Sequence, residues 1–190
     1  MFNSDNLRLD GKCAIITGAG AGIGKEIAIT FATAGASVVV SDINADAANH
    51  VVDEIQQLGG QAFACRCDIT SEQELSALAD FAISKLGKVD ILVNNAGICK
   101  LNKVLDFGRA DWDPMIDVNL TAAFELSYEA AKIMIPQKSG KIINICSLFS
   151  YLGGQWSPAY SATKHALAGF TKAYCDELGQ YNIQVNGIAP

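Results

Sequence analysis

The sequence predicts an α/β fold in which a doubly wound parallel sheet is covered by helices on both faces. Short apolar segments alternate along the chain with longer segments whose apolar residues recur at helical spacing. Several short segments are apolar throughout, which is typical of parallel strands buried on both faces. Small or polar residues follow five of them, namely Gly18, Asp42, Asp68, Asn94 and Ser147. Because ligands of open α/β sheets bind outside the carboxyl ends of the strands, these residues predict one binding edge.

In the first half of the chain we expect three strands, each followed by a helix. The strands fall at 13–17, 37–41 and 62–65, and the first helix spans 22–34 and is closed by Gly35. The second helix begins after Asn44, which can cap it, and ends at a pair of glycines. The third helix begins after Thr70 or Ser71, either of which can serve as its cap.

In the second half we expect strands at 91–93, 141–146 and 183–186. One long helix is expected over 112–135 in spite of Pro114, because proline is tolerated in the first turn of a helix. A last helix is expected over 158–178. The chain has no linker, repeat or low-complexity segment, so residues 1–190 are predicted to form a single domain.

Composition excludes several classes of function. The net charge of −6 and the pI near 4.8 argue against a nucleic-acid surface, which needs clustered Lys and Arg. No apolar run approaches membrane-spanning length, and the N-terminus does not resemble a secretion signal, so we expect a cytoplasmic protein. The six cysteines are therefore expected to be reduced. Cys65 and Cys67 have no second Cys or His pair beside them, so no metal site is expected.

The first motif is the glycine-rich stretch that follows the first strand and opens the first helix. Its spacing is T-G-x-x-x-G-x-G, with Thr17, Gly18, Gly22 and Gly24 at the fixed positions, and it does not fit G-x-G-x-x-G. Glycine lets the backbone approach a ligand closely, and a helix N-terminus offers N–H groups and a positive dipole end. The stretch therefore predicts a cradle for the phosphates of a dinucleotide, although a simple tight turn is the alternative.

Asp42 lies 18 residues after Gly24, at the end of the second strand. A carboxylate at this position can accept hydrogen bonds from an adenosine ribose and would repel the 2′-phosphate of NADP. Neither position 21 nor position 43 holds an Arg or Lys to offset that repulsion, so NAD is the predicted cofactor. Asp68 and Ile69 are expected to frame the adenine, although Asp68 taken alone is as readily structural.

The second motif is Tyr160-Ser161-Ala162-Thr163-Lys164, in which Tyr160 and Lys164 share one face of the last helix. A tyrosine hydroxyl titrates near ~10 in water, and a fixed ammonium nearby lowers that value by roughly 1–3 units. Tyr160 can then act as base toward an alcohol or as acid toward a ketone. Ser147, 13 residues earlier, can hydrogen-bond the same substrate oxygen.

With these motifs the sequence resembles the short-chain dehydrogenase/reductase family over its whole length. The resemblance rests on Thr17–Gly24, on Asn94-Asn95-Ala96-Gly97, and on Tyr160 with Lys164. It implies a Rossmann fold, a polarising role for Ser147, and a role for Asn119 in holding a relay water beside the lysine. It also implies a cofactor site formed by Gly18, Gly22, Ile23, Gly24, Asp42, Ile43, Asp68, Ile69, Asn95, Ala96, Gly97, Tyr160, Lys164 and Pro190.

Two branches of the family compete for the substrate. Residues 1–97 resemble the bacterial NAD-dependent 7α-hydroxysteroid dehydrogenases, whereas residues 98–190 resemble sugar-acid dehydrogenases of the gluconate and 2-dehydro-3-deoxygluconate type. This shift suggests a chimera. The resemblance also implies that a seventh strand and a substrate lid follow the sixth strand in the family, beyond Pro190.

The predicted function is therefore hydride transfer between a secondary alcohol or ketone, of the hydroxysteroid or sugar-acid class, and NAD, with Tyr160 as general acid/base. The family resemblance further implies a homo-oligomer, a dimer or a tetramer, formed through the long helix and the Tyr160 helix. The alternative is a non-catalytic dinucleotide-binding fragment or an engineered chimera without turnover.

Overall fold

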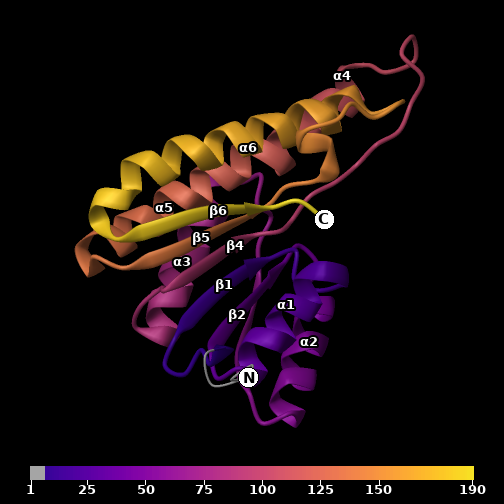
Figure 1. The fold of residues 1–190 in the computed structure, drawn as a ribbon. Helices are drawn as coiled ribbons and strands as arrows, with labels where there is room; N and C mark the ends of the chain where they lie inside the picture. Colours follow the sequence, from indigo (N-terminus) through magenta and orange to yellow (C-terminus); the bar gives the residue numbers. More distant parts are fainter. Residues whose placement is uncertain (1–6) are drawn as a thin grey trace, which may run out of the picture.

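The computed structural model describes residues 7–190 and shows a single six-stranded sheet flanked by helices (Figure 1). All five strand pairs are parallel, and the strand order is β3-β2-β1-β4-β5-β6. The order runs outward in both directions from β1 and β4, so the predicted doubly wound sheet is confirmed. The strands are β1 (Cys13–Thr17), β2 (Ser37–Asp42), β3 (Gln61–Arg66), β4 (Ile91–Asn94), β5 (Gly140–Ile145) and β6 (Ile183–Ile188).

Helices cover both faces of the sheet, with more helices on one face than on the other (Figure 1). One face packs against α1 (Gly22–Thr33) and α2 (Ala45–Gln57), and the other against α3 (Glu72–Leu86), α5 (Ala122–Gln137) and α6 (Pro158–Leu178). A shorter helix, α4 (Arg109–Ile116), leads into α5, and single turns η3 (Leu148–Ser150) and η4 (Gly179–Tyr181) flank α6.

The core follows the alternation of side chains along the strands. In β1, Ala14 and Ile16 face α1 and α2, whereas Ile15 faces α3 and α5. All of β1 and all of β4 are buried, as expected for central parallel strands covered on both sides. The sheet can therefore hold its carboxyl edge rigid, which is where the site residues lie.

Two helix caps expected from the sequence are confirmed. The Asn44 side chain accepts a hydrogen bond from the Ala47 N–H at 3.1 Å, and the Ser71 side chain accepts one from the Glu74 N–H at 3.3 Å. Each bond satisfies a backbone donor that the first turn of a helix leaves without an intrahelical partner.

The long helix expected over 112–135 is wrong in its bounds and in its regularity. Helical structure begins at Arg109, ends at Gln137, and is interrupted by a π-helical turn, η2 (Asp117–Thr121). In this turn the Ala122 N–H donates to the Asp117 carbonyl, five residues back. Apolar periodicity does not reveal such a turn, because Met115 before it and Leu126 after it are both buried.

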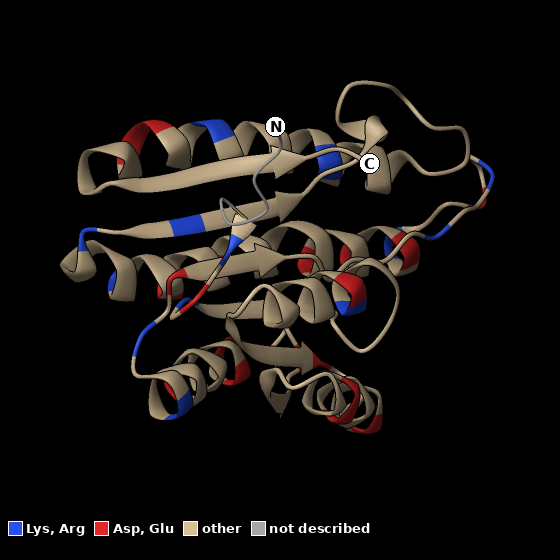
Figure 2. Cartoon of the chain, turned by 60° about the horizontal axis from the view of Figure 1, so that its bottom comes forward, with Lys and Arg blue, Asp and Glu red and all other residues tan. Residues whose placement is uncertain are grey.

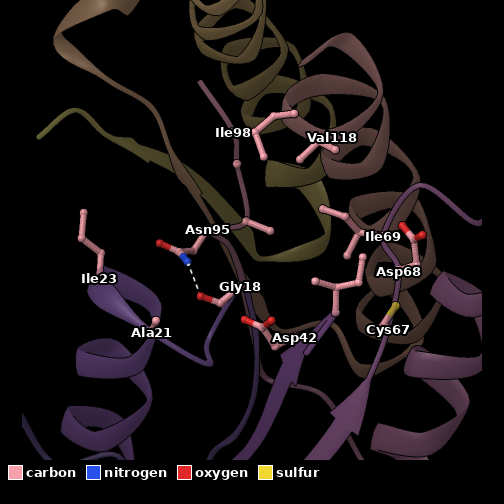
Figure 3. A pocket seen from close by; sticks show the side chains of 13 residues that line it. Gly18, Ala21, Ile23, Asp42, Cys67, Asp68, Ile69, Asn95, Ile98 and Val118 are labelled. Atoms are coloured by element: carbon pink, nitrogen blue, oxygen red, sulfur yellow. Dashed lines mark hydrogen bonds between the residues drawn. The ribbon is translucent and has the colours of Figure 1, made fainter. Parts of the chain in front are cut away.

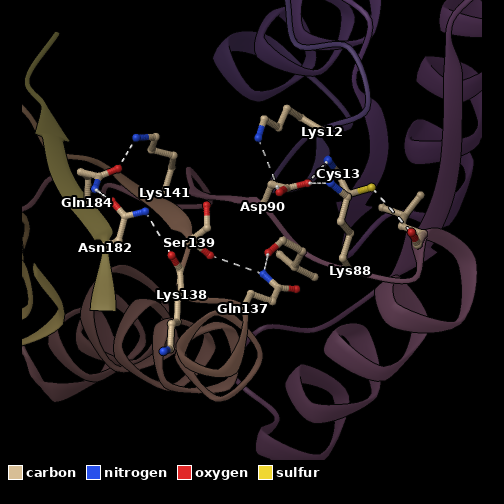
Figure 4. A network of polar contacts seen from close by, with 12 residues as sticks. Lys12, Cys13, Lys88, Asp90, Gln137, Lys138, Ser139, Lys141, Asn182 and Gln184 are labelled. Carbon is tan, nitrogen blue, oxygen red and sulfur yellow. Dashed lines mark hydrogen bonds and ion pairs between the residues drawn. The ribbon is translucent and has the colours of Figure 1, made fainter. Parts of the chain in front are cut away.

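A network of polar contacts ties the amino ends of the strands together, at the edge of the sheet opposite the predicted site (Figure 4). The Asp90 carboxylate accepts a hydrogen bond from the Cys13 N–H at 2.9 Å and pairs with Lys88 at 2.8 Å. Gln137 donates to the Val89 carbonyl, and Lys141 donates to Gln184. These contacts link the starts of β1, β4, β5 and β6, so they fix the sheet without entering the site.

The sheet ends at β6, which has a partly uncovered face. Ile183 and Val185 pack under α6, but the alternate residues Asn186 and Ile188 face the α1 side and are exposed, Ile188 by 51%. A sheet edge with exposed apolar residues is a surface prone to pairing with another chain.

Blue and red segments are interspersed over the elements in the view of Figure 2, and the blue segments do not gather into a basic face. Among residues 7–190, no helix is both long enough and apolar enough to cross a membrane.

Candidate functional site

Two adjoining hollows lie at the carboxyl edge of the sheet and have residues in common. The larger, about 460 Å³, is bounded by the ends of β1, β2, β3 and β4 (Figure 3). The smaller, about 280 Å³, is bounded by the ends of β4 and β5 and by the start of α6. Both are lined by Ile23, Asn95, Gly97 and Ile98, so the two hollows form one continuous site.

The glycine-rich turn needs its glycines. Gly18 and Gly22 have φ values of +59° and +56°, which L side chains rarely adopt. A Cβ on Gly18 would lie 2.8 Å from the Ala96 Cα, and one on Gly24 would collide with the Gly18 carbonyl. The N-cap residue of α1 is Ala21, which has no polar side chain to cap the helix. The turn is therefore a close-fitting backbone cradle at a helix N-terminus, as the spacing predicts.

The Asn-Asn-Ala-Gly segment braces this cradle from β4. The Asn95 side chain donates to the carbonyls of Thr17, at 2.9 Å, and Gly18, at 3.1 Å (Figure 3). In return, the Thr17 hydroxyl accepts from the backbone N–H groups of Asn95 and Ala96 and donates to the Val93 carbonyl. These bonds hold the end of β1 against the end of β4, where the two hollows meet.

The Asp42 carboxylate lies at the far end of the larger hollow and also shapes the turn. Its two oxygens accept from the N–H groups of Gly20 and Asn44, each at 2.9 Å. A carboxylate has about four lone-pair sites, so both oxygens keep acceptor capacity toward a ligand hydroxyl.

Asp68 and Ile69 line the larger hollow beside Asp42, as expected. The Thr70 hydroxyl and then the Thr70 N–H hydrogen-bond the Asp68 carboxylate and lower its pKa. Asp68 therefore both stabilises the local turn and lines the larger hollow, so the structural and the ligand-contacting interpretations of this residue are compatible with each other.

Ser147, Tyr160 and Lys164 all line the smaller hollow. The Lys164 ammonium is buried, lies 5.6 Å from the centroid of the Tyr160 ring, and donates to the Ile145 carbonyl at 2.6 Å. Burial lowers the pKa of Lys164. The Ser147 Oγ accepts from the Phe149 N–H at 3.2 Å, so its own proton can be donated toward the hollow. A phenol, an ammonium and a hydroxyl thus surround one small space, which suits proton transfer at an alcohol or ketone.

Asn119 lies in the π-helical turn and does not line either hollow. Its side chain accepts from the Ile98 N–H and donates to the Ile98 carbonyl, both at 2.8 Å, and also donates to the Thr163 hydroxyl at 3.3 Å. Ile98 lines both hollows, and Thr163 is one turn after Tyr160 on α6. Asn119 therefore links the lining of the hollows to the helix that carries Tyr160.

Most of the residues expected in the cofactor site come together in these hollows. Gly22 and Gly24 belong to the glycine-rich turn but line neither hollow, and Pro190 lines the smaller hollow. The sequence reasoning missed seven lining residues. Each neighbours a motif residue, a strand end or the π turn, and that position is the signal: Ala21, Cys67, Ile98, Cys99, Val118, Ile145 and Cys146.

All six cysteines are free thiols. Within residues 7–190, no cluster of three or more His, Cys, Asp or Glu side chains has a geometry that could hold a metal ion.

Comparison with known proteins gives matches over the whole chain. The family described as short chain dehydrogenase matches residues 12–190. The chain is 66% identical over 189 residues to YgcW, an uncharacterized oxidoreductase of Escherichia coli strain K12, covering 100% of this chain and 72% of YgcW. It is 65% identical over 190 residues to the 7α-hydroxysteroid dehydrogenase of the same strain, covering 100% of this chain and 74% of that protein.

A solved structure of a 7α-hydroxysteroid dehydrogenase complexed with NADH and 7-oxo glycochenodeoxycholic acid matches with a TM-score of 0.96. At 65% identity, that match covers 100% of this chain and 74% of the other. The 5-keto-D-gluconate 5-reductase of strain K12 is 39% identical over 187 residues, covering 98% of this chain and 74% of that protein. These identities are averages over whole alignments and give no support to a chimera joined at residue 97.

Proposed function

The chain belongs to the short-chain dehydrogenase family, and from that premise we propose that it is an NAD-dependent oxidoreductase for a hydroxysteroid-like secondary alcohol or ketone. The observation that carries the proposal is the continuity of the two hollows, which places Tyr160, Lys164 and Ser147 beside the glycine-rich turn. The rival hypothesis is a dinucleotide-binding fragment without turnover. It does not explain why a tyrosine, a lysine and a serine lie together at one end of the site.

The larger hollow fits NAD. Its glycine turn packs Gly18 directly against Ala96 with no room for a side chain, so bare backbone borders the hollow there, and its acidic end is formed by Asp42. In this proposal the N-terminus of α1 holds the phosphates, Asp42 accepts from the adenosine ribose, and Asp68 with Ile69 frames the adenine. Asn95, Ala96 and Gly97 then line the way to the smaller hollow. When bound, NAD supplies the hydride acceptor or, in its reduced form, the hydride donor.

The catalytic roles follow from the chemistry of the three groups. Tyr160 takes the proton of the substrate hydroxyl or returns it to a ketone oxygen. Lys164 holds its ammonium 5.6 Å from the centroid of the Tyr160 ring, and it also lies where a ribose hydroxyl can reach it. Ser147 donates to the substrate oxygen as negative charge develops there. Asn119 positions the neighbouring backbone through Ile98 and Thr163.

The substrate class is supported by what surrounds the smaller hollow. Lys164 is the cation among its lining residues, so a sugar acid would find no second positive charge there for its carboxylate. The segment between Ser147 and Tyr160 instead exposes large apolar side chains, namely Leu148, Tyr151, Leu152 and Trp156. Together with the higher identity to a hydroxysteroid dehydrogenase, these residues favour a steroid-like substrate over a sugar acid.

We further propose a cytoplasmic homo-oligomer. Phe124 and Tyr128 of α5 are about half exposed and lie beside Phe170 and Tyr174 of α6, with the Phe124 and Phe170 ring centroids 6.2 Å apart. An exposed aromatic patch of this kind is typical of a protein interface. A Phe124→Lys variant is expected to dissociate in analytical ultracentrifugation, whereas a monomeric parent chain would contradict the proposal. Six free thiols suit a reducing compartment.

The function is tested by NAD titration together with absorbance at the reduced-nicotinamide band over a panel of hydroxysteroids and sugar acids. Binding of NAD without its reduction by any alcohol of the panel would favour the rival. Tyr160→Phe is expected to keep NAD affinity and to lose most of kcat, because it removes the proton acceptor and little else. Tyr181→Phe, in the turn η4 that follows α6, is the matched control and is expected to keep kcat. Near-normal turnover by Tyr160→Phe would place the base elsewhere.

A further inference from the structure

The single turn η3 (Leu148–Ser150) contacts all three of the residues Ser147, Tyr160 and Lys164, the last through its backbone carbonyl. The Phe149 ring packs edge-on against the Tyr160 ring, with centroids 6.1 Å apart and planes at 85°. Gly154 makes room for this ring, because a Cβ there would lie 2.9 Å from it. The Phe149 N–H is also the group that binds the Ser147 hydroxyl. The turn therefore sits between the catalytic serine and the catalytic helix.

Ser150 is the residue of this turn that bonds to both sides at once. Its hydroxyl accepts from the Ser147 N–H at 3.2 Å and donates to the Lys164 carbonyl at 2.8 Å. Ser150 is 5% exposed, so neither bond competes freely with water. One hydroxyl thus joins the backbone of the serine to the backbone of the lysine.

The backbone bonds on either side of Ser147 run to β6 and the residues after it, not to α6, because the Cys146 N–H donates to the Ile188 carbonyl and the Leu148 N–H to the Pro190 carbonyl. Ser147 stands at the N-cap of η3 in an extended conformation, and the reciprocal bonds of Ser147 and Ser150 form a capping box. Without the Ser150 hydroxyl, the Ser147 N–H loses its acceptor and the turn loses its direct bond to α6. The Ser147 backbone would then be tied to α6 only indirectly, through the bond from the Lys164 ammonium to the Ile145 carbonyl, the bond from the Gly154 N–H to the Ser161 hydroxyl, and packing.

We propose that Ser150 is a positioning residue, whose hydroxyl holds Ser147 in register with Lys164 and Tyr160 for the reaction. This inference rests on the proposed function. It assigns Ser150 no contact with substrate or cofactor, because neither hollow is lined by it. Small displacements of a catalytic group reduce the rate far more than they reduce binding of a cofactor held elsewhere.

Three variants test the proposal. Ser150→Ala removes both bonds, and Ser150→Cys keeps a group of similar size with much weaker hydrogen bonding. Ser127→Ala is the matched control, because Ser127 is equally buried and bonded, to Asn94, but does not bond to any of the three groups. The measurements are kcat, the KM of the alcohol, the Kd of NAD, the melting temperature, and amide hydrogen exchange at residue 147.

For Ser150→Ala we expect kcat to fall at least about tenfold, with exchange at residue 147 accelerated and the Kd of NAD within about twofold of the parent. In Ser150→Cys we expect kcat to fall by less than in Ser150→Ala. In Ser127→Ala we expect the melting temperature to fall about as much as in Ser150→Ala, while kcat stays at the parent value. Unchanged kcat or unchanged exchange in Ser150→Ala would overturn the proposal, as would equal kcat losses in Ser150→Ala and Ser127→Ala. If Ser150→Ala does not fold, a parent-like kcat in Ser150→Cys would overturn it too. A parent without turnover would refute the proposed function alone, and exchange at residue 147 would still decide the role of Ser150.

Discussion

Replacing Asp42 with alanine should change which cofactor the chain prefers. Asp42 is half-buried at the end of the larger hollow, and its carboxylate binds the N–H groups of Gly20 and Asn44. In the parent chain we expect NAD to bind at least about tenfold better than NADP, a difference of about 1.4 kcal/mol. In Asp42→Ala we expect the two dissociation constants to differ by less than about threefold, below 1 kcal/mol.

The size of the effect follows from charge and from geometry. Two unit charges 4 Å apart repel by about 1 kcal/mol in bulk water and by about 4 kcal/mol at the effective dielectric of a protein surface. A 2′-phosphate beside Asp42 falls between these limits, so a tenfold preference needs only part of the available repulsion. The variant also removes two hydrogen bonds to a charged acceptor, which support the glycine turn. We therefore expect NAD itself to bind several-fold more weakly, while NADP binding is unchanged or improved.

The assay is fluorescence or calorimetric titration of both cofactors at two salt concentrations, because screening weakens the charge term and leaves the turn geometry unaltered. Asp46→Ala is the matched control. Asp46 is an exposed acid in the first turn of α2 and does not line the hollow, so its loss changes net charge alone. Equal dissociation constants for NAD and NADP in the parent would refute the reasoning, and so would an unchanged ratio in Asp42→Ala.

Three further outcomes are expected. Burial lowers the pKa of Lys164 below its usual 10.5, so between these two values Lys164 contributes a rise of the free energy of unfolding with pH, whereas buried thiols such as Cys67, whose pKa is raised, contribute a fall. In denaturant titrations at a series of pH values, the difference in free energy of unfolding between the parent and Lys164→Met should therefore grow with pH over that range, and a difference that does not change with pH would refute the assignment. Burial raises the pKa of Cys67 to about 12, whereas Cys99 and Cys175 are exposed. A thiol reagent near neutral pH should therefore label the two exposed cysteines first, as followed by mass spectrometry, and bound NAD should slow the labelling of Cys99. Early labelling of Cys67 would show that the structure around this thiol opens readily. The outer edge of β6 has no neighbouring strand within residues 7–190 and exposes Ile188, so it should promote self-association, and Ile188→Lys should reduce that association in dynamic light scattering. Equal association of the parent and Ile188→Lys would contradict that expectation.

The sheet could be predicted from the sequence because its signals are local. Apolar runs such as Ile91-Leu92-Val93 are short and bounded by polar residues, so each strand was found within two residues of its ends. The helix caps Asn44 and Ser71 were found for the same reason, since capping depends on residues three positions apart.

The site was predictable as a set of strand ends, but the contacts between those ends were not. The bonds from Asn95 to Thr17 and Gly18 join residues 77 and 78 positions apart, and no local pattern specifies them. The same holds for Ser150, whose partner Lys164 lies on a different element. The resemblance to a family supplied the roles, and the packing of η3 against α6 could be seen only in three dimensions.

The π-helical turn at Asp117–Thr121 has a consequence for how this segment tolerates changes in chain length. One more residue than an α-helix would use separates α4 from α5, and it lets Asn119 face Ile98 while Met115 and Leu126 stay buried. A π turn absorbs one extra residue within a single turn, so the helices on either side keep nearly the phase that an uninterrupted α-helix one residue shorter would give them. Deleting one residue of the turn should therefore restore a regular α-helix and leave α4 and α5 oriented much as they are. The change would fall on the turn itself, where Asn119 would lose the local backbone geometry that places it against Ile98.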